Sequence, residues 1–500
     1  MDRRLAILFL ILLLGAPCLA HVGSPDVYFQ GDAGPYHLAI TIRTPQMIPG
    51  VAEIEIRSSD PGIHQVKFVP LYIVGPGSKY PPPPDVLLPS KDDPQFFSGK
   101  LWLMASGSWQ VRVEADGDRG SGTVAVPVPA FARNTMPMQK GLGALLSGLM
   151  ILLVLAIVSI FGAARREGQL EPGMPSGPPQ RRAARLAMAI ALAFVIGLLS
   201  LGGWWWKVAA AERAQRMIYK PPQLLVSLLP GGKMLLRVGD SSWHSRRTEA
   251  VSTKIIPDHR HLMHLFLIRV PQMDRFYHLH PVEDKGGVFL DELPPVSAGH
   301  YQIFADIVRE SGFPDTLVSE MDIPENPGQP LAGDDSAVTA PALSPNATGN
   351  LDFALPDGAR MIWERQPGPL PTNQLLWFRF RVQDAAGITA IDLEPYMGMA
   401  GHAEFVRSDL SVFAHVHPDG TASMAAVELA QASLPGNLTQ PLGAARNAMP
   451  AMEMTGKREG APLSVVAFPY GFPKPGLYRI FVQLKRGGRV ETGVFDTWVK

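Results

Sequence analysis

The segment Gly299-His300-Tyr301-Gln302-Ile303-Phe304 has the pattern of a turn that leads into a half-buried strand. This pattern occurs three times in the 500-residue chain. The other copies are Gly107-Ser108-Trp109-Gln110-Val111-Arg112-Val113 and Gly476-Leu477-Tyr478-Arg479-Ile480-Phe481. In each copy an aromatic residue follows the glycine by two positions and an apolar residue follows the aromatic by two, so alternate side chains point to one face. Three occurrences predict three copies of one β-sandwich domain and a mainly β fold.

The composition agrees with short strands joined by many turns. The chain has 48 glycines and 48 prolines, which spread without a collagen period. Both exceed the usual shares of about 7% and 5%, so long-helix and coiled-coil folds are disfavoured. The predicted sandwiches span residues 21–131, 216–324 and 351–500, and a polar linker rich in Pro, Gly, Ala and Ser is expected at 325–350.

The first twenty residues have the three-part layout of a secretory signal. Arg3 and Arg4 precede an apolar run, and small residues end at Ala20, so cleavage is expected before His21. The chain has one cysteine, Cys18, which lies within residues 1–20. A disulfide framework, a CxxC redox pair, a four-cysteine zinc site and an iron–sulfur cluster are therefore excluded.

Two apolar runs, residues 142–163 and 186–206, each approach the roughly 20 residues that a membrane-spanning helix needs. The loop between them, 164–185, has five arginines against two glutamates, which predicts that it lies in the cytoplasm. The two flanking regions would then lie outside. We expect an integral protein of the inner or cytoplasmic membrane, with its large domains on the periplasmic or extracytoplasmic side and a two-helix transmembrane hairpin as its anchor.

The charge balance excludes one class of partner. The chain has 45 basic and 45 acidic residues, so no overall positive field exists to attract nucleic acid.

Eight of the thirteen histidines fall in two related motifs. The second domain has Asp258-His259-Arg260-His261-Leu262-Met263-His264, followed by His278-Leu279-His280-Pro281. The third has Tyr396-Met397-Gly398-Met399-Ala400-Gly401-His402, followed by His415-Val416-His417-Pro418. Aligning the motifs places methionines where the second domain has His259 and His261.

These motifs have the residue types of a metal site. Residues two apart on a strand share a face, so each HxH pair presents two imidazoles together, and His264 or His402 would reach them from the preceding strand. Three nitrogens suit copper or zinc, and thioethers favour Cu(I), so copper is preferred over zinc. The expected ligands are His261, His264, His278 and His280 in the second domain, and Met397, Met399, His402, His415 and His417 in the third. The alternative is that HxHP is a structural turn repeated by duplication.

Three other features of the sequence bear on metal binding. If the signal is cleaved as expected, the free amine and imidazole of His21 would chelate one copper ion together, with His37 or His64 as a third ligand. The methionine-rich segment 449–454 is either a copper-collecting loop or apolar packing. His244 and His300 are expected to be structural or solvated.

The residues also suggest a family. The first domain, with His21-Val22-Gly23-Ser24-Pro25-Asp26 and its Gly107–Val113 strand, resembles the YtkA-like and FixH-like exported domains, and a chain that starts at His21 is similar to CopC-type copper carriers. The HxHP motifs resemble those of exported heavy-metal-binding proteins. The resemblance implies an immunoglobulin-like fold and a link to copper handling, although the membrane hairpin departs from single-domain relatives.

The leading hypothesis is a membrane-anchored copper-binding protein that sequesters copper or delivers it to a cupro-enzyme or a copper transporter. The alternative is a non-enzymatic scaffold for a membrane complex, with incidental histidines. No enzyme is expected, because the sequence has no GxSxG, P-loop or HExxH motif and no cysteine nucleophile with a histidine partner.

Overall fold

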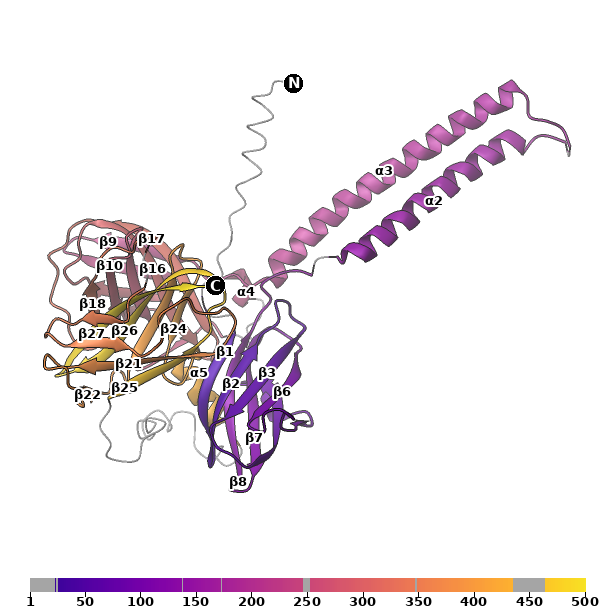
Figure 1. The fold of residues 1–500 in the computed structure, drawn as a ribbon. Helices are drawn as coiled ribbons and strands as arrows, with labels where there is room; N and C mark the ends of the chain where they lie inside the picture. The colour runs from indigo at the N-terminus through magenta and orange to yellow at the C-terminus, as the bar shows by residue number, and fades with distance from the viewer. Residues whose placement is uncertain are drawn as a thin grey trace. The chain divides into compact units, whose positions relative to one another are not determined.

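The structure is a computed structural model that describes residues 23, 26–136, 138–171, 173–245, 252–346, 349–434 and 464–500. The chain forms two compact units. One consists of the segments before Ala132 and after Ile218, and the other is Ala132–Ile218. The first unit contains three antiparallel β-sandwiches, and the second contains two long helices (Figure 1).

The first sandwich packs two four-stranded sheets around one core. One sheet, in the order β1-β2-β3-β6, consists of Val27–Ala33, Tyr36–Arg43, Gly50–Ser58 and Phe96–Leu103. The other, in the order β5-β4-β7-β8, consists of Asp85–Leu87, Ile63–Tyr72, Gly107–Gly117 and Gly120–Ala130. A short 3-10 helix, η1, spans Pro76–Lys79. In β3, Ala52, Ile54 and Ile56 are buried, as the period of two requires.

The second sandwich has a four-stranded and a six-stranded sheet. The smaller, in the order β14-β15-β10-β9, consists of Val282–Lys285, Val288–Glu292, Lys233–Val238 and Leu224–Leu229. The larger, in the order β11-β16-β12-β13-β18 with β17 beside β16, consists of Ile255–Ile256, Gly299–Arg309, His264–Val270, Arg275–Leu279, Ser336–Thr339 and Pro314–Ile323. The one-turn helix α4 spans Ser242–Ser245.

The third sandwich repeats this plan. Its smaller sheet, in the order β19-β20-β21-β25, consists of Asp352–Ala354, Arg360–Trp363, Leu376–Gln383 and Val465–Tyr470. Its larger sheet, in the order β22-β26-β23-β24 with β27 beside β26, consists of Leu393–Glu394, Gly476–Arg486, His402–Arg407, Phe413–Val416 and Arg489–Val499. Helix α5 spans Met424–Ala432.

The repeated motif forms the same element in every sandwich. β7, β16 and β26 are 11-residue strands, each paired with the strand that follows it. The aromatic residue of each copy donates a hydrogen bond to the carbonyl four positions upstream: Trp109 to Ala105, Tyr301 to Ser297 and Tyr478 to Lys474. This bond ties the incoming turn to the strand. The prediction of a mainly β fold with three immunoglobulin-like sandwiches is confirmed.

The second and third sandwiches share an apolar cluster made from their larger sheets. Phe276 stacks on Phe481 and Phe304 stacks on Phe413, each pair with ring centroids 4.2 Å apart and planes 12° from parallel. Phe276 and Phe413 occupy equivalent positions, two residues before the first histidine of each HxHP motif. Phe304 and Phe481 are also equivalent, because each lies five residues after the glycine that begins its strand, Gly299 or Gly476. Each stack therefore pairs a phenylalanine of one kind from one sandwich with a phenylalanine of the other kind from the other sandwich. This reciprocal contact is typical of a pseudo-two-fold arrangement.

The expected linker is partly a strand. Within 325–350, β18 pairs with β13, and Ala337 and Val338 lie opposite Tyr277 and Phe276. This part of the prediction is corrected, because two apolar residues inside the polar segment add an edge strand to the second sandwich.

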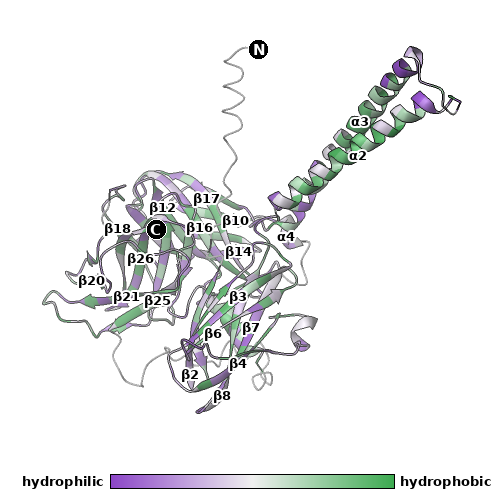
Figure 2. Ribbon diagram, turned by 45° about the vertical axis from the view of Figure 1, so that its right-hand side comes forward, coloured by the Kyte–Doolittle hydropathy of each residue, from purple (hydrophilic) through white to green (hydrophobic). Residues whose placement is uncertain are grey.

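The second unit is an antiparallel pair of helices, α2 (Lys140–Glu167) and α3 (Pro178–Met217) (Figure 1). Both are long and apolar enough to cross a membrane. Figure 2 shows hydrophobic residues along most of each helix and hydrophilic ones near the turn that joins them. The helices extend beyond the expected spans of 142–163 and 186–206.

Candidate metal centre

The larger sheet of the second sandwich places three histidines on one face. In the β12–β13 pair Phe266 lies opposite His278, so His264 and His280 fall on the same side as His278. His264 Nδ1 lies 3.1 Å from His278 Nε2, and the rings of His264 and His280 are 5.0 Å apart. Phe266 stacks on His278 at 4.3 Å between ring centroids, which fixes the plane of that imidazole.

The third sandwich repeats the arrangement with its own residues. In the β23–β24 pair Glu404 lies opposite His415, so His402 and His417 share its face. Ring centroids are 5.3 Å apart for His402 and His415, 5.0 Å for His402 and His417, and 4.6 Å for His415 and His417.

The turn before β12 directs two histidines to different neighbours. His259 and Arg260 have positive φ angles of 50° and 73°, so His259 and His261 do not share a strand face. His259 Nε2 lies 3.3 Å from His417 Nε2 in the third sandwich. His261 instead packs on His280 at 4.0 Å between ring centroids. The sequence analysis did not select His259 as a ligand, although it forms a third HxH pair with His261.

The equivalent turn of the third sandwich contributes backbone groups in place of histidines. Met397 and Gly398 have φ angles of 50° and 82°, the same conformation as the second-sandwich turn. The carbonyl of Met397 lies 2.9 Å from His259 Nδ1. The backbone of Met399 closes the turn by hydrogen bonds with Tyr396. The expectation that the thioethers of Met397 and Met399 bind metal stays a prediction.

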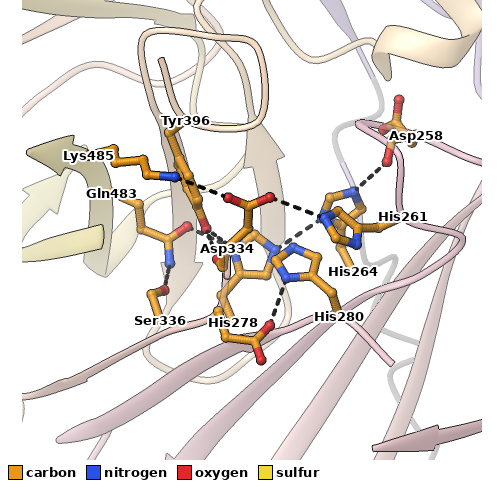
Figure 3. Close-up of polar contacts among 11 residues, drawn as sticks. Asp258, His261, His264, His278, His280, Asp334, Ser336, Tyr396, Gln483 and Lys485 are labelled. Atoms are coloured by element: carbon orange, nitrogen blue, oxygen red, sulfur yellow. Dashed lines mark hydrogen bonds and ion pairs between the residues drawn. The ribbon is translucent and has the colours of Figure 1, made fainter. Parts of the chain in front are cut away.

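The two histidine sets form one cluster within the unit of three sandwiches. Rings from different sandwiches approach to 5.0 Å for His259 and His402, 5.4 Å for His264 and His415, and 5.7 Å for His278 and His415. Figure 3 shows the second-sandwich histidines beside Tyr396 of the third sandwich. The structure therefore gathers eight histidines, where the sequence suggested separate sets: His259, His261, His264, His278, His280, His402, His415 and His417.

Most of these histidines have a hydrogen-bond acceptor at one ring nitrogen. His278 Nδ1 lies 2.8 Å from Gln483 Oε1, and Gln483 Nε2 in turn donates to Ser336 Oγ, which orients the amide. The other acceptors are Met397 O for His259 Nδ1 at 2.9 Å, Asp258 O for His264 Nε2 at 3.2 Å, Asp335 Oδ1 for His280 Nδ1 at 2.9 Å and Ala422 O for His417 Nδ1 at 3.1 Å. His415 Nδ1 lies 3.4 Å from a carboxyl oxygen of Asp306. In a neutral imidazole the N–H faces the acceptor, so the other nitrogen presents its lone pair to the cluster.

Burial favours the neutral form of six of these imidazoles. It lowers the pKa of His264, His278, His280, His402 and His417 well below the ordinary value and also lowers the pKa of His259, and neighbouring histidines add to the effect. Neutral imidazole is the form that binds a metal. Several inward nitrogens have no hydrogen-bond partner among the described residues: His280 Nε2, His415 Nε2 and both ring nitrogens of His402.

Carboxyl groups surround the cluster. Glu404 is fully buried, neither of its carboxyl oxygens has a partner among the described residues, and burial raises its pKa well above the usual range. Burial also raises the pKa of Asp335 to about 6. Asp334 lies 3.5 Å from His261 and 3.5 Å from Lys485 (Figure 3). A bound cation would find negative charge close by.

The sequence carried a signal for two of these partners. Asp306 and Gln483 lie seven residues after Gly299 and Gly476, and each is a polar residue in a strand that is otherwise mostly apolar. Each one contacts a histidine of the other sandwich. A polar residue repeated at one position of a duplicated buried strand indicates a shared functional role. Asp334 and Asp335 were missed because they fall in the expected linker.

A cavity of about 110 Å³ borders the cluster. Its lining includes His264, His415 and His417 at one part and Tyr219 and Asp315 at another. Tyr219 directly follows the helical unit in the chain. The histidines are thus reachable from a hollow within the three-sandwich unit.

The first sandwich supports this region through β1. Gln30 N donates to Asp419 O at 2.9 Å, and Thr421 N donates to Tyr28 O at 2.9 Å. Gly420 has a φ of 128° and would place any Cβ within 1.8 Å of Tyr28 O. The turn after His417 is therefore held by backbone contacts with the first sandwich.

The other histidines that the structure describes, namely His37, His64, His244 and His300, do not belong to the cluster. His244 is buried against Asp315, and His300 is exposed beside Asp322. His37 and His64 pair with Asp32 and Asp118. His21 and the segment 449–454 lie outside the described residues, so their proposed roles stay predictions.

One family model and several solved structures are similar to parts of this chain. A family model described as a domain of unknown function (DUF8832) matches residues 354–500. A search of curated proteins finds no match to this chain. Similar solved structures include the chicken CNTN1 FN1–FN3 domains, at 7% identity and TM-score 0.14, with 92% of this chain and 97% of that chain covered. They also include an ICAM-5 D1–D4 ectodomain fragment, at 8% identity and TM-score 0.16, with 93% and 77% covered.

Proposed function

We propose that this protein is a membrane-anchored, outward-facing copper-binding protein that holds copper in the eight-histidine cluster and sequesters it or passes it to a partner. The role is non-enzymatic. Suitable partners are a cupro-enzyme under assembly or a copper transporter.

The observation that carries the proposal is the direction of the imidazole lone pairs. Five histidines have a hydrogen-bond acceptor at one nitrogen, and the lone pair of the other faces the cluster. Metal-binding histidines in proteins have this outer-partner arrangement. Leaving buried lone pairs unsatisfied costs roughly 1–3 kcal/mol per group. A bound cation would satisfy them.

The donor set favours copper over zinc. Imidazole nitrogen binds both metals, and for a given set of donors Cu(II) binds more tightly than Zn(II). An exported chain without cysteine in its mature part would depend on such nitrogen donors. The thioethers of Met397 and Met399 are not needed for this argument.

The anchor and its orientation are part of the same proposal. The support for them is the length and apolarity of α2 and α3, the arginines near the turn that joins the helices, and the signal-like residues 1–20.

The test is metal titration of the full chain in detergent with Cu(I), Cu(II) and Zn(II) in competition with chelators. A variant with His278, His280, His415 and His417 all changed to Ala is compared with a control that carries His37→Ala, His64→Ala and His300→Ala. We expect tight copper binding by the parent and the control, with at least 100-fold weaker binding by the cluster variant. Circular dichroism checks that each protein is folded.

Other outcomes would change the conclusion. Equal, weak binding by all three proteins would overturn the copper proposal and favour the scaffold. Tighter binding of zinc than copper would retain the site but replace the metal.

A further inference from the structure

We infer that the cluster holds two metal ions, one within the second sandwich and one that joins the second sandwich to the third. This inference rests on the proposed function and deepens it. The first position is His264, His278 and His280, and the second is His259, His402 and His417. In each triad, one ring nitrogen from every histidine lies within 4.8 Å of the others.

The first triad contains two lone pairs that face each other. His264 gives its Nε2 hydrogen to Asp258 O, and His278 gives its Nδ1 hydrogen to Gln483 Oε1. Neither His264 Nδ1 nor His278 Nε2 then has a hydrogen, although they are only 3.1 Å apart. Two such nitrogens repel each other unless a cation or an extra proton lies between them.

The second triad has the same arrangement across the two sandwiches. His259 gives its Nδ1 hydrogen to Met397 O, and His417 gives its Nδ1 hydrogen to Ala422 O. Their Nε2 atoms face each other at 3.3 Å. At metal–nitrogen distances of roughly 2.0–2.1 Å, two ligands on one tetrahedral ion lie about 3.3–3.4 Å apart. Both facing pairs are therefore close to the spacing that one ion requires.

Each triad is completed by a nitrogen without a partner. His280 Nε2 belongs to the first triad, and the ring nitrogens of His402 belong to the second; none has a hydrogen-bond partner among the described residues. No histidine is shared between the triads. His415, whose Nε2 is also unpartnered, contacts rings of both triads at 5.4 Å from His264 and 4.6 Å from His417.

Carboxyl groups lie beside the histidine cluster. The donors are neutral imidazoles, and four carboxyl groups lie near them: Asp306, Asp334, Asp335 and Glu404. Burial raises the pKa of Glu404 and Asp335, so a cation beside these two groups would favour their charged form. Lys485 lies 3.5 Å from Asp334.

The two positions differ in what their occupation does to the fold. All ligands of the first come from the second sandwich, so its ion leaves the contact between the sandwiches unchanged. The second takes His259 from one sandwich and His402 and His417 from the other, so its ion cross-links them. Occupation of the second position would thus stabilise the contact between the sandwiches.

The experiment counts copper per full-length chain after Cu(II) loading and removal of excess metal, using the parent protein, His280→Ala, His259→Ala and the control His300→Ala. We expect two ions in the parent and control and one in each cluster variant. Electron paramagnetic resonance should show magnetic coupling between two Cu(II) ions in the parent, and an uncoupled signal in both single variants. Copper should also raise the melting temperature of His280→Ala more than that of His259→Ala.

The possible failures are distinguishable. A parent that binds no copper would remove the proposed function together with this inference. A parent that binds one ion, which either variant loses completely, would leave the function and overturn the two-ion arrangement. Melting temperatures raised equally in both variants would overturn the cross-link. His259→Gln, which keeps a polar side chain of similar reach, replaces His259→Ala if that variant is unfolded without metal.

Discussion

The turns Asp258–His261 and Tyr396–Met399 have the same backbone and different chemistry. Each closes by hydrogen bonds between its first and last residues, and each has positive φ at both central positions. The first presents His259 to the third sandwich, whereas the second offers the carbonyl of Met397 to that same histidine. The two related turns are thus complementary: one supplies a histidine, and the other provides the carbonyl that this histidine contacts.

The largest expected effect is a loss of stability of the metal-free protein at low pH, to which buried and exposed histidines contribute with opposite sign. Six cluster histidines have a pKa lowered by burial, whereas the unfolded value is about 6.5. Above about pH 6.5 both states are neutral, so these groups do not change stability. Below it, the unfolded chain binds protons that the folded chain does not, so the free energy of unfolding falls by up to about 1.4 kcal/mol per pH unit for each histidine.

Urea unfolding of the metal-free full chain at pH 7.5, 6.5 and 5.5 measures this loss. In the cluster variant the free energy of unfolding should fall less between pH 6.5 and 5.5. His300 is a contrast of opposite sign, because Asp322 raises its pKa, so its contribution is present at low pH and disappears as pH rises. Equal pH dependence of parent and variant would contradict the comparison.

The next effect tests the equivalence of the two aromatic contacts. Phe481→Ala and Phe304→Ala each remove the equivalent member of a stack with the same 4.2 Å spacing, and each should cost about 3–5 kcal/mol of unfolding free energy. Denaturant titration measures the cost, and the half-buried Phe96→Ala serves as a control with a smaller loss. A large effect at one position only would break the pseudo-two-fold description.

A smaller effect on copper affinity distinguishes Gln483 from Asp306, the residues that lie beside His278 and His415. Gln483→Leu removes the acceptor 2.8 Å from His278, so copper affinity should fall by about 10–100-fold. Asp306→Asn keeps an oxygen near His415, where the present distance is 3.4 Å, so its effect should be tenfold or less. Competition titration measures both, with Asp322→Asn as the control. Unchanged affinity in Gln483→Leu would mean that this partner does not orient His278.

The smallest expected effect is a change in stability on substitution in the turns Asp258–His261 and Tyr396–Met399. Gly398→Ala should cost about 1 kcal/mol, because φ at that position is 82° although no atom would contact the added Cβ. Arg260→Gly, at the equivalent position with φ of 73°, should stabilise the protein by a similar amount. Thermal unfolding measures both changes, and changes of the same sign would show that the turns are not equivalent.

Local pattern allowed much of the architecture to be predicted. The strands β7, β16 and β26, the apolar helices and the HxHP pairs follow from periodicity and spacing alone. The direction of His259 did not, because a positive φ in the turn cannot be read from the letters His-Arg-His. The contacts of Met397 O with His259 and of Asp335 with His280 also escaped, since the first involves a backbone carbonyl and Asp335 lies in a polar segment that resembles a linker.

The sequence by itself determined the repeated sandwich, the apolar helices and the faces on which the histidines lie, because alternation along a strand is a local property. Only the tertiary structure decided that the two histidine sets form one cluster. The stacks of Phe276 on Phe481 and Phe304 on Phe413 join residues 205 and 109 positions apart in the chain. Such contacts depend on the packing of completed sheets, which no pattern within a single strand specifies.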